Sequence, residues 1–198
     1  MSTLSKKHEF DLVFDSQQVF RLMLEALSSP GTPQELGRYA NKLYGDRPAC
    51  LAVATTLLDN EVSFHVSASS ELAEEIHALT LAEEACAASA DFVFVCDPDQ
   101  LEQAIETAKC GTLSDPHKSA TLIIENEGAP VCRLLLSGPG IDDQKELWAT
   151  ERFRDAIALR DAQRYEYPQG IDLFFLSRLG ELVAVPRLTR MEVVSWHM

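Results

Sequence analysis

The sequence predicts an α/β fold, a three-layer α/β/α sandwich in which helices cover both faces of a mixed sheet. Short apolar runs without polar alternation indicate strands that are buried on both faces. Segments with apolar residues at helical spacing lie before, between and after these runs, which indicates helices packed on a sheet. Two pairs of runs are joined by short turn-forming segments, so we expect hairpins and a sheet that is not wholly parallel. The clearest runs span residues 91–96, 120–124, 171–176 and 182–185.

Composition and charge limit the number of domains and the kinds of partner. The chain has 198 residues, of which 46% are hydrophobic and 24% charged, an ordinary balance for a single domain spanning residues 1–198. The net charge of −14 would repel phosphodiester backbones and anionic membrane surfaces, so we expect neither nucleic acid nor a membrane as a partner. The first residues are polar and contain no apolar run of signal-peptide length, which predicts a cytoplasmic protein.

The N-terminal half predicts helices around one strand. We expect a helix from Asp15, which would cap it in a capping box with Gln18, to the Ser-Ser-Pro-Gly sequence at 28–31. That sequence could hold an anion through its backbone donors, but a helix stop is the favoured interpretation. Pro48 is expected to begin a second helix. The next predicted elements are a strand at 62–66 with His65 on its polar face, a helix at 69–80, and a helix or loose turn at 81–90.

The middle of the chain predicts a strand–helix unit and then a hairpin. Residues 91–96 form the buried strand, and Asp99 is expected to cap the following helix. The apolar runs at 120–124 and 131–137 are expected to pair as a hairpin across the turn between them.

The Gly138-Pro139-Gly140 turn precedes a helix predicted from residue 142 to about 164. A glycine-rich turn in this position is typical of phosphate-binding loops. We reject that interpretation because Pro139 has no backbone N–H to donate and no Gly-Lys-Ser/Thr follows. In addition, Asp142 and Asp143 place carboxylates where a phosphate would lie.

Residues 167–190 predict a hairpin of two strands buried on both faces, with its turn at 177–180. Asp172 lies inside the first of these strands, and an ionised carboxylate there needs a cationic or hydrogen-bonding partner. We expect Asp172 to face roughly Val185, which brings Arg187 within diagonal reach of it.

Asp172, Arg187 and Arg190 are therefore the candidate site residues, with two interpretations. In the first, Asp172 and Arg187 form an ion pair that fixes the register of the hairpin, with Arg190 as the next nearest cation. In the second, Arg187 binds a phosphate-like anion and Asp172 holds the guanidinium in place. The structural interpretation is favoured, because such pairs commonly support folds and because the net negative charge discourages anions.

Other residues that commonly carry chemistry show no recognised spacing. The cysteines at 50, 86, 96, 110 and 132 form no Cys-x-x-Cys pair, and the five histidines form no His-x-x-x-His or His-x-His pair. A metal site would have to be assembled from distant segments, and we predict none. Nucleophile-elbow and dinucleotide motifs are also absent from the sequence. We therefore predict reduced thiols and no catalytic residues.

Several segments, taken in order along the chain, carry a family resemblance. They are Phe20-Arg21 with 26–31, Leu57-Leu-Asp-Asn60, Cys110-Gly-Thr112 with Pro116 and 120–122, 136–141, 168–173 and Val185-Pro-Arg-x-Thr189-x-x-Glu192. Together they resemble the PhnH family, whose members are a subunit of the bacterial carbon–phosphorus lyase system for phosphonate breakdown, and the resemblance spans about the whole chain. It implies a cut-down version of the large domain of pyridoxal phosphate-dependent aminotransferases without the cofactor, a homodimer when isolated, and assembly with the other lyase core subunits.

The resemblance also implies a function. It predicts a subunit required for carbon–phosphorus bond cleavage, accessory to the step that attaches a phosphonate to the ribose of ATP in place of adenine, with the radical and nucleosidase chemistry in other subunits. The alternative is an enzyme or small-anion-binding protein with a site near Arg187. No cofactor is expected: Lys118 alone among six lysines lies near a strand end, and its polar neighbours indicate a surface lysine rather than a Schiff base.

Overall fold

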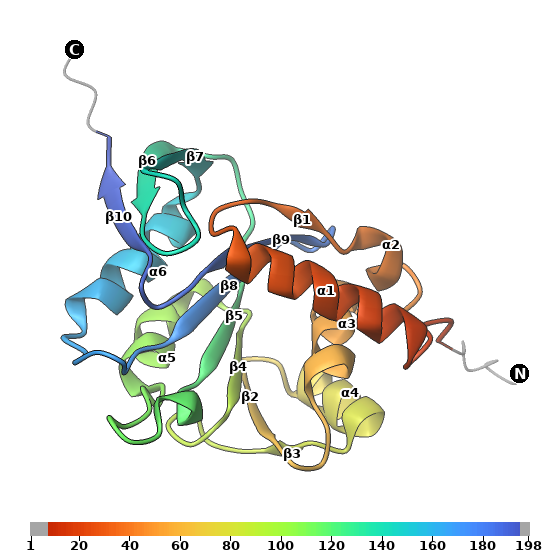
Figure 1. The fold of residues 1–198 in the computed structure, drawn as a ribbon. Helices are drawn as coiled ribbons and strands as arrows, with labels where there is room; N and C mark the ends of the chain where they lie inside the picture. Colours follow the sequence, from red (N-terminus) through yellow and green to blue (C-terminus); the bar gives the residue numbers. More distant parts are fainter. Residues whose placement is uncertain (1–7, 195–198) are drawn as a thin grey trace, which may run out of the picture.

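The computed structural model describes residues 8–194 and places a seven-stranded mixed sheet at the centre of the molecule (Figure 1). The strand order is β1-β9-β8-β5-β4-β2-β3. The five strands from β8 to β3 run parallel, whereas β9 is antiparallel to β8, and β1 is antiparallel to β9. The strands are β1 (Gln34–Glu35), β2 (Ser63–Ser67), β3 (Glu83–Glu84), β4 (Phe92–Val95), β5 (Thr121–Glu125), β8 (Asp172–Leu176) and β9 (Glu181–Val185).

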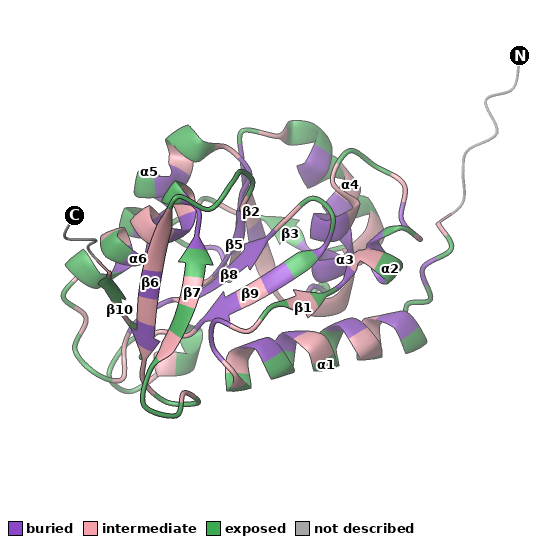
Figure 2. Ribbon diagram, turned by 90° about the horizontal axis from the view of Figure 1, so that it is seen from above, coloured by how far each residue is buried: buried purple, intermediate pink, exposed green. Residues whose placement is uncertain are grey.

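Helices cover both faces of this sheet, as expected. On one face lie α1 (Phe14–Ser28), α2 (Gly37–Ala40), α3 (Pro48–Leu57) and α4 (Ser70–Thr80); on the other lie α5 (Leu101–Thr107) and α6 (Glu151–Ala162) (Figure 1). Successive strand residues point to opposite faces, so Phe94 and Ile123 enter the first core while Val93 and Leu122 enter the second. The central strands are buried along their length (Figure 2). Within the described residues, no helix combines the length and apolarity needed to cross a membrane.

A second, three-stranded sheet has the order β10-β6-β7 and is formed by β6 (Cys132–Ser137), β7 (Lys145–Ala149) and β10 (Arg190–Val193). The predicted hairpin between 120–124 and 131–137 is therefore wrong. β5 is buried on both faces and joins β4 and β8 in the large sheet. In β6, burial favours alternate residues, Leu134 and Leu136, which suits a strand with one covered face.

The helix predicted from residue 142 to about 164 is only partly correct. Residues 145–149 form β7, which pairs with β6, and α6 begins at Glu151. The hydroxyl of Thr150 accepts from the backbone N–H of Phe153, which caps the helix. Asp143 has φ +62°, a left-handed conformation that a continuous helix cannot contain.

The two predicted acidic caps also need correction. Asp15 lies inside the first turn of α1, where its carboxylate accepts hydrogen bonds from the backbone N–H of Asp11 at 2.8 Å and from Lys42. The side chain that accepts from the backbone N–H groups of Val13 and Phe14, at the start of the helix, is instead that of Asp11. The side chain of Asp97, not Asp99, caps the short 3₁₀ helix η1 (Pro98–Gln100) that leads into α5. The segment 81–90, predicted as a helix or a loose turn, contains no helix; it forms the two-residue edge strand β3 and a turn at 87–89.

The C-terminal hairpin forms as predicted, with β8 antiparallel to β9 and Gly180 in the turn at φ +98°. Its register differs by one residue from the expected one. Leu173, rather than Asp172, faces Val185, so Asp172 lies opposite the end of β9 at Pro186. Because of this shift, Asp172 lies closer to Arg187 than it would in the expected register, in which the two residues were diagonal neighbours.

Candidate functional site

Asp172 and Arg187 meet where β9 ends, and they make a dense set of hydrogen bonds. Asp172 Oδ1 accepts from the backbone N–H of Arg187 at 2.8 Å and from its Nε at 3.2 Å, and Oδ2 accepts from Nη2 at 2.5 Å. The remaining guanidinium donors reach Ser119 Oγ at 2.7 Å and the carbonyls of Pro116 and Pro168 at 3.1 and 3.4 Å. A guanidinium has five N–H donors. Those of Arg187 are therefore taken up by the protein, which ties the 116–119 and 168 loops to the hairpin.

Arg160 of α6 holds the chain just beyond this pair. It is 1% exposed and donates to the carbonyls of Val185, Pro186 and Thr189 at 3.2, 3.0 and 2.6 Å, and to Asp161 through Nε and Nη2. No local sequence pattern indicates this role, because Arg160 and the carbonyls that it binds are 25 to 29 residues apart. Arg190, the third predicted site residue, lies exposed on β10 and pairs through its backbone with Ser137.

A cavity of about 620 Å³ lies beside these arginines. Its lining is polar and includes Arg160, Arg164, Arg187 and Arg190 together with Asp161 and Glu192. The hydroxyl of Thr189, a residue 1% exposed on the cavity wall, is buried without a hydrogen-bond partner among residues 8–194.

A second cavity, of about 840 Å³, lies at the carboxyl ends of β4 and β5. In α/β sheets the carboxyl ends of parallel strands are the usual position of ligand sites. Its polar lining comes from four separate parts of the chain: Cys96 follows β4, Glu125 ends β5, Arg178 lies in the β8–β9 turn, and the start of α6 supplies Thr150, Glu151, Arg152 and Asp155.

Glu125 is the anionic centre of this second cavity. It is 5% exposed, and its two carboxylate oxygens each accept from a different arginine, Arg47 Nε and Arg178 Nε, both at 2.8 Å. Arg152 approaches from α6 and donates through Nη2 to the carbonyl of Val95 at 2.9 Å, while its buried Nε has no hydrogen-bond partner among the described residues. Burial lowers the pKa of the Arg152 guanidinium.

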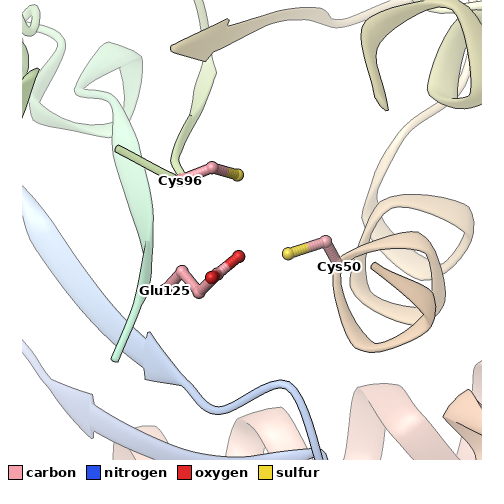
Figure 3. A group of neighbouring side chains, drawn as sticks. All are labelled: Cys50, Cys96 and Glu125. Atoms are coloured by element: carbon pink, nitrogen blue, oxygen red, sulfur yellow. The ribbon is translucent and has the colours of Figure 1, made fainter. Parts of the chain in front are cut away.

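Two cysteines complete this region. Cys50 projects from α3 and Cys96 from the end of β4, and both point toward Glu125 (Figure 3). The two Sγ atoms and a carboxylate oxygen of Glu125 all lie within 4.8 Å of one another. Among the described residues, this is the one group of three or more His, Cys, Asp or Glu side chains whose possible ligand atoms lie this close together. Cys50, Cys96 and Glu125 are far apart in the sequence, which is why they form no metal-ligand spacing motif there.

Other residues considered in the sequence lie elsewhere. Lys118 ends a 3₁₀ turn (η2, Pro116–Lys118) with its side chain 64% exposed and 3.4 Å from Asp115. His65 Nδ1 contacts the carbonyl of Ala85 at 3.0 Å. The Gly138–Gly140 turn packs on the chain at 28–31, since a Cβ at Gly140 would lie 2.5 Å from the carbonyl oxygen of Ser28. Trp196, in the C-terminal tail, lies outside the described residues.

Comparison with known proteins agrees with the resemblance seen in the sequence. The family model described as bacterial phosphonate metabolism protein (PhnH) matches residues 9–192. A curated relative from Rhizobium meliloti (strain 1021), named alpha-D-ribose 1-methylphosphonate 5-triphosphate synthase subunit PhnH, is 28% identical over 193 residues, which cover 92% of this chain and 92% of the relative. The chain therefore belongs to the PhnH family of bacterial phosphonate metabolism proteins.

Proposed function

We propose that this chain is a non-catalytic subunit of the carbon–phosphorus lyase core complex. In this role it supports the step that attaches a phosphonate to the ribose of ATP in place of adenine. The observation that carries the proposal is the nearly end-to-end match to a family of phosphonate metabolism proteins, together with a relative of the same length that is named as a synthase subunit. The contacts of Asp172 and Arg187 support it, because donors that are used within the fold are not available to a substrate.

A subunit needs a surface for its partners, and α1 offers one. Val13, Phe20 and Leu24 recur at helical spacing, and 70%, 45% and 48% of their surfaces respectively are exposed. The adjacent Leu12 and Phe14 are exposed by 62% and 72%. We refer to these five residues as the α1 stripe. Grouped apolar side chains on a surface commonly mark protein interfaces. In the isolated protein we expect this stripe to bury itself against a second copy in a two-fold dimer.

The interface can be tested with a matched pair of substitutions on α1. Leu24→Glu places a charge in the stripe, whereas Gln18→Glu adds the same charge at a half-buried polar position on another face of the same helix. We expect the first variant to be monomeric by light scattering after size exclusion and the second to remain dimeric. A parent protein that is a clean monomer at micromolar concentration would contradict the dimer.

The assembly role has a separate test. A tagged copy should be purified from bacteria grown on a phosphonate as the only phosphorus source, in a strain that lacks the chromosomal copy. We expect the other lyase core subunits to co-purify and growth to depend on the tagged chain. Normal growth without the chain, or purification without those subunits, would overturn the proposal.

The proposed fold relationship is to the large domain of pyridoxal phosphate-dependent transferases, without their cofactor. The mixed sheet with helices on both faces supports it. The exposed position of Lys118 is unsuitable for a Schiff base, which needs a desolvated amine. Incubation with pyridoxal phosphate should therefore give no stoichiometric aldimine absorbance. A band that disappears in Lys118→Ala would contradict this.

The alternative function is binding of a small anion near Arg187. The 620 Å³ cavity favours it, through the unpartnered hydroxyl of Thr189 and the arginines on its wall. Because the donors of Arg160 and Arg187 are used by the protein, Arg164 and Arg190 would have to supply the charge. Calorimetric titration with methylphosphonate decides between the two functions: binding that is lost in Arg164→Gln and Arg190→Gln, but kept in the surface variant Arg154→Gln, would favour the anion site.

A further inference from the structure

Cys50 and Cys96 form a thiol pair with two unequal members. Cys96 follows β4, is 8% exposed and belongs to the lining of the 840 Å³ cavity. Cys50 lies behind it on α3, is 4% exposed, and does not belong to the cavity lining. The two sulfur atoms face each other, with no backbone element between them (Figure 3). Cys96 is thus placed to react with a reagent in the cavity, and Cys50 is placed to react with the oxidised Cys96.

The charges around the pair favour a thiolate over a bound cation. Both oxygens of Glu125 already accept from Arg47 and Arg178, and Arg152 adds a third guanidinium at the same cavity. A divalent ion between the sulfurs and Glu125 would therefore lie among three positive charges. A thiolate, in contrast, is stabilised by nearby cations.

The Cys96 thiol is expected to lose its proton at a lower pH than the Cys50 thiol. A hydrogen bond from Cys50 lowers the pKa of the Cys96 thiol, burial opposes this, and Arg47 and Arg152 lower it further. The same hydrogen bond, together with burial, raises the pKa of Cys50. Cys96 is accordingly the nucleophile, and Cys50 keeps its proton until a later step.

We propose that Cys96 and Cys50 are a redox-active pair, in which Cys96 reacts with a small hydroperoxide that enters the cavity and Cys50 closes a disulfide between α3 and β4. This site is independent of the proposed subunit function. It shares no residue with the α1 stripe.

The chemistry balances in two steps. The Cys96 thiolate attacks one peroxide oxygen, the O–O bond breaks, and the departing hydroxide or alkoxide takes up the proton that the Cys96 thiol released when it ionised. Cys50 then gives up its proton and attacks the sulfur of the Cys96 sulfenic acid, so that an S–S bond forms and water leaves. The two cysteines together lose two electrons, and the peroxide is reduced to water or to an alcohol and water.

The test uses the full chain with Cys86→Ser, which removes the most exposed competing thiol. The reduced protein is treated with one equivalent of hydrogen peroxide, the remaining thiols are alkylated, and the peptides are mapped by mass spectrometry. We expect a disulfide that joins Cys50 to Cys96 and that dithiothreitol reverses. With Cys50→Ser added, the reaction should stop at a sulfenic acid on Cys96 that dimedone traps. Cys132→Ser, at a half-buried thiol of the other sheet, should behave like the parent.

Three results would overturn the proposal. The first is that Cys96 stays reduced while Cys110 or Cys132 is oxidised. The second is a disulfide that joins another pair. The third is a purified protein that carries stoichiometric zinc and loses it on substitution of Cys50 or Cys96, which would identify a metal centre instead. The first two results come from peptide mapping of the protein with both cysteines intact, so a variant that fails to fold leaves the proposal falsifiable.

Discussion

Arg160 and Arg152 lie two turns apart on the same helix, yet they differ in what they do with their donors. Arg160 makes five hydrogen bonds to protein acceptors, three of them to the backbone carbonyls of the hairpin end. Arg152 makes one, to Val95, and leaves a buried Nε without a partner among residues 8–194. Buried donors are almost always bonded, so an exception needs an explanation. A saturated arginine indicates a fold support, and an unsaturated one beside a cavity indicates a position where something binds or reacts.

The same contrast separates the two ends of the sheet. Asp172 is the first residue of β8, and its partner Arg187 belongs to a closed set of contacts. Glu125 is the last residue of the neighbouring strand β5, and together with Arg178, Arg152 and Cys96 it lines an open cavity. The carboxylate at the amino end of the sheet is thus enclosed by protein contacts, whereas the one at the carboxyl end borders a cavity that also holds a thiol.

The largest expected effect is that of Arg160→Met. The substitution keeps most of the side-chain volume but leaves the carbonyls of Val185, Pro186 and Thr189 without their donor. We expect a loss of about 3–4 kcal/mol in the free energy of unfolding, measured by urea titration with circular dichroism. Arg154→Met is the matched control on the same helix: its ion pairs are exposed, so its loss should change stability far less. An equal loss of stability in the two variants would contradict the view that Arg160 supports the fold more than an exposed arginine does.

Asp172→Asn should have the next largest effect. The asparagine can still accept from the N–H of Arg187, but the guanidinium loses its counter-charge in a partly buried position. We expect a loss of about 2 kcal/mol, with assembly reduced only through misfolding. Asp115→Asn, in an exposed ion pair with Lys118, is the control and should change stability by less than about 1 kcal/mol. An Asp172→Asn protein with unchanged melting temperature that no longer supports growth on phosphonate would favour the anion-site interpretation.

Glu125→Gln should affect stability less and thiol reactivity more. The amide keeps an acceptor for one arginine and loses the buried negative charge, for which we expect a cost of about 1–2 kcal/mol. Glu125 raises the pKa of Cys96, so its removal should increase the thiolate fraction and speed alkylation by iodoacetamide at neutral pH. Unchanged or slower alkylation would contradict this electrostatic account. Glu127→Gln, at the exposed rim of the same cavity, is the control.

Arg152→Gln should have the smallest effect on stability of these substitutions and a clear effect on the reactivity of Cys96 at the cavity. With one hydrogen bond lost, we expect a stability change within about 1 kcal/mol. Because Arg152 lowers the pKa of Cys96, the thiolate should form at higher pH in the variant. The pH profile of Cys96 alkylation should therefore move upward, and the rate at neutral pH should fall several-fold. A profile identical to that of the parent would show that Arg152 does not act on Cys96.

These contrasts also show what could be learned from sequence. The hairpin at 171–185 and the need of Asp172 for a cation followed from apolar runs and the cost of burying charge, and the structure brings Asp172 and Arg187 together. The one-residue error in register changed the geometry, because the turn does not by itself fix which residues pair. The helix predicted at 142–164 includes β7, because a short segment whose apolar residues Leu147 and Trp148 are adjacent does not by itself distinguish a strand from a helix.

The cavity cluster could not be predicted in the same way. Cys50, Cys96 and Glu125 come from a helix and two strands, and only the strand order brings them together. The one usable signal was that Cys96 and Glu125 each follow or end an apolar run. In parallel strands such residues meet at one edge, but the pairing of β4 with β5 was not visible from the sequence.

The strand order has a consequence for synthesis of the chain. β8 lies between β5 and β9, and Gln34 in β1 pairs with Leu182 in β9, near the opposite end of the sequence. While the ribosome still holds the last strands, β5 has one unpaired edge and β1 has no partner. Contacts between such distant segments form late because long loops must close first. The nascent chain should therefore complete its fold only once β8 and β9 have left the ribosome, and until then its exposed β5 edge is a natural target for chaperones.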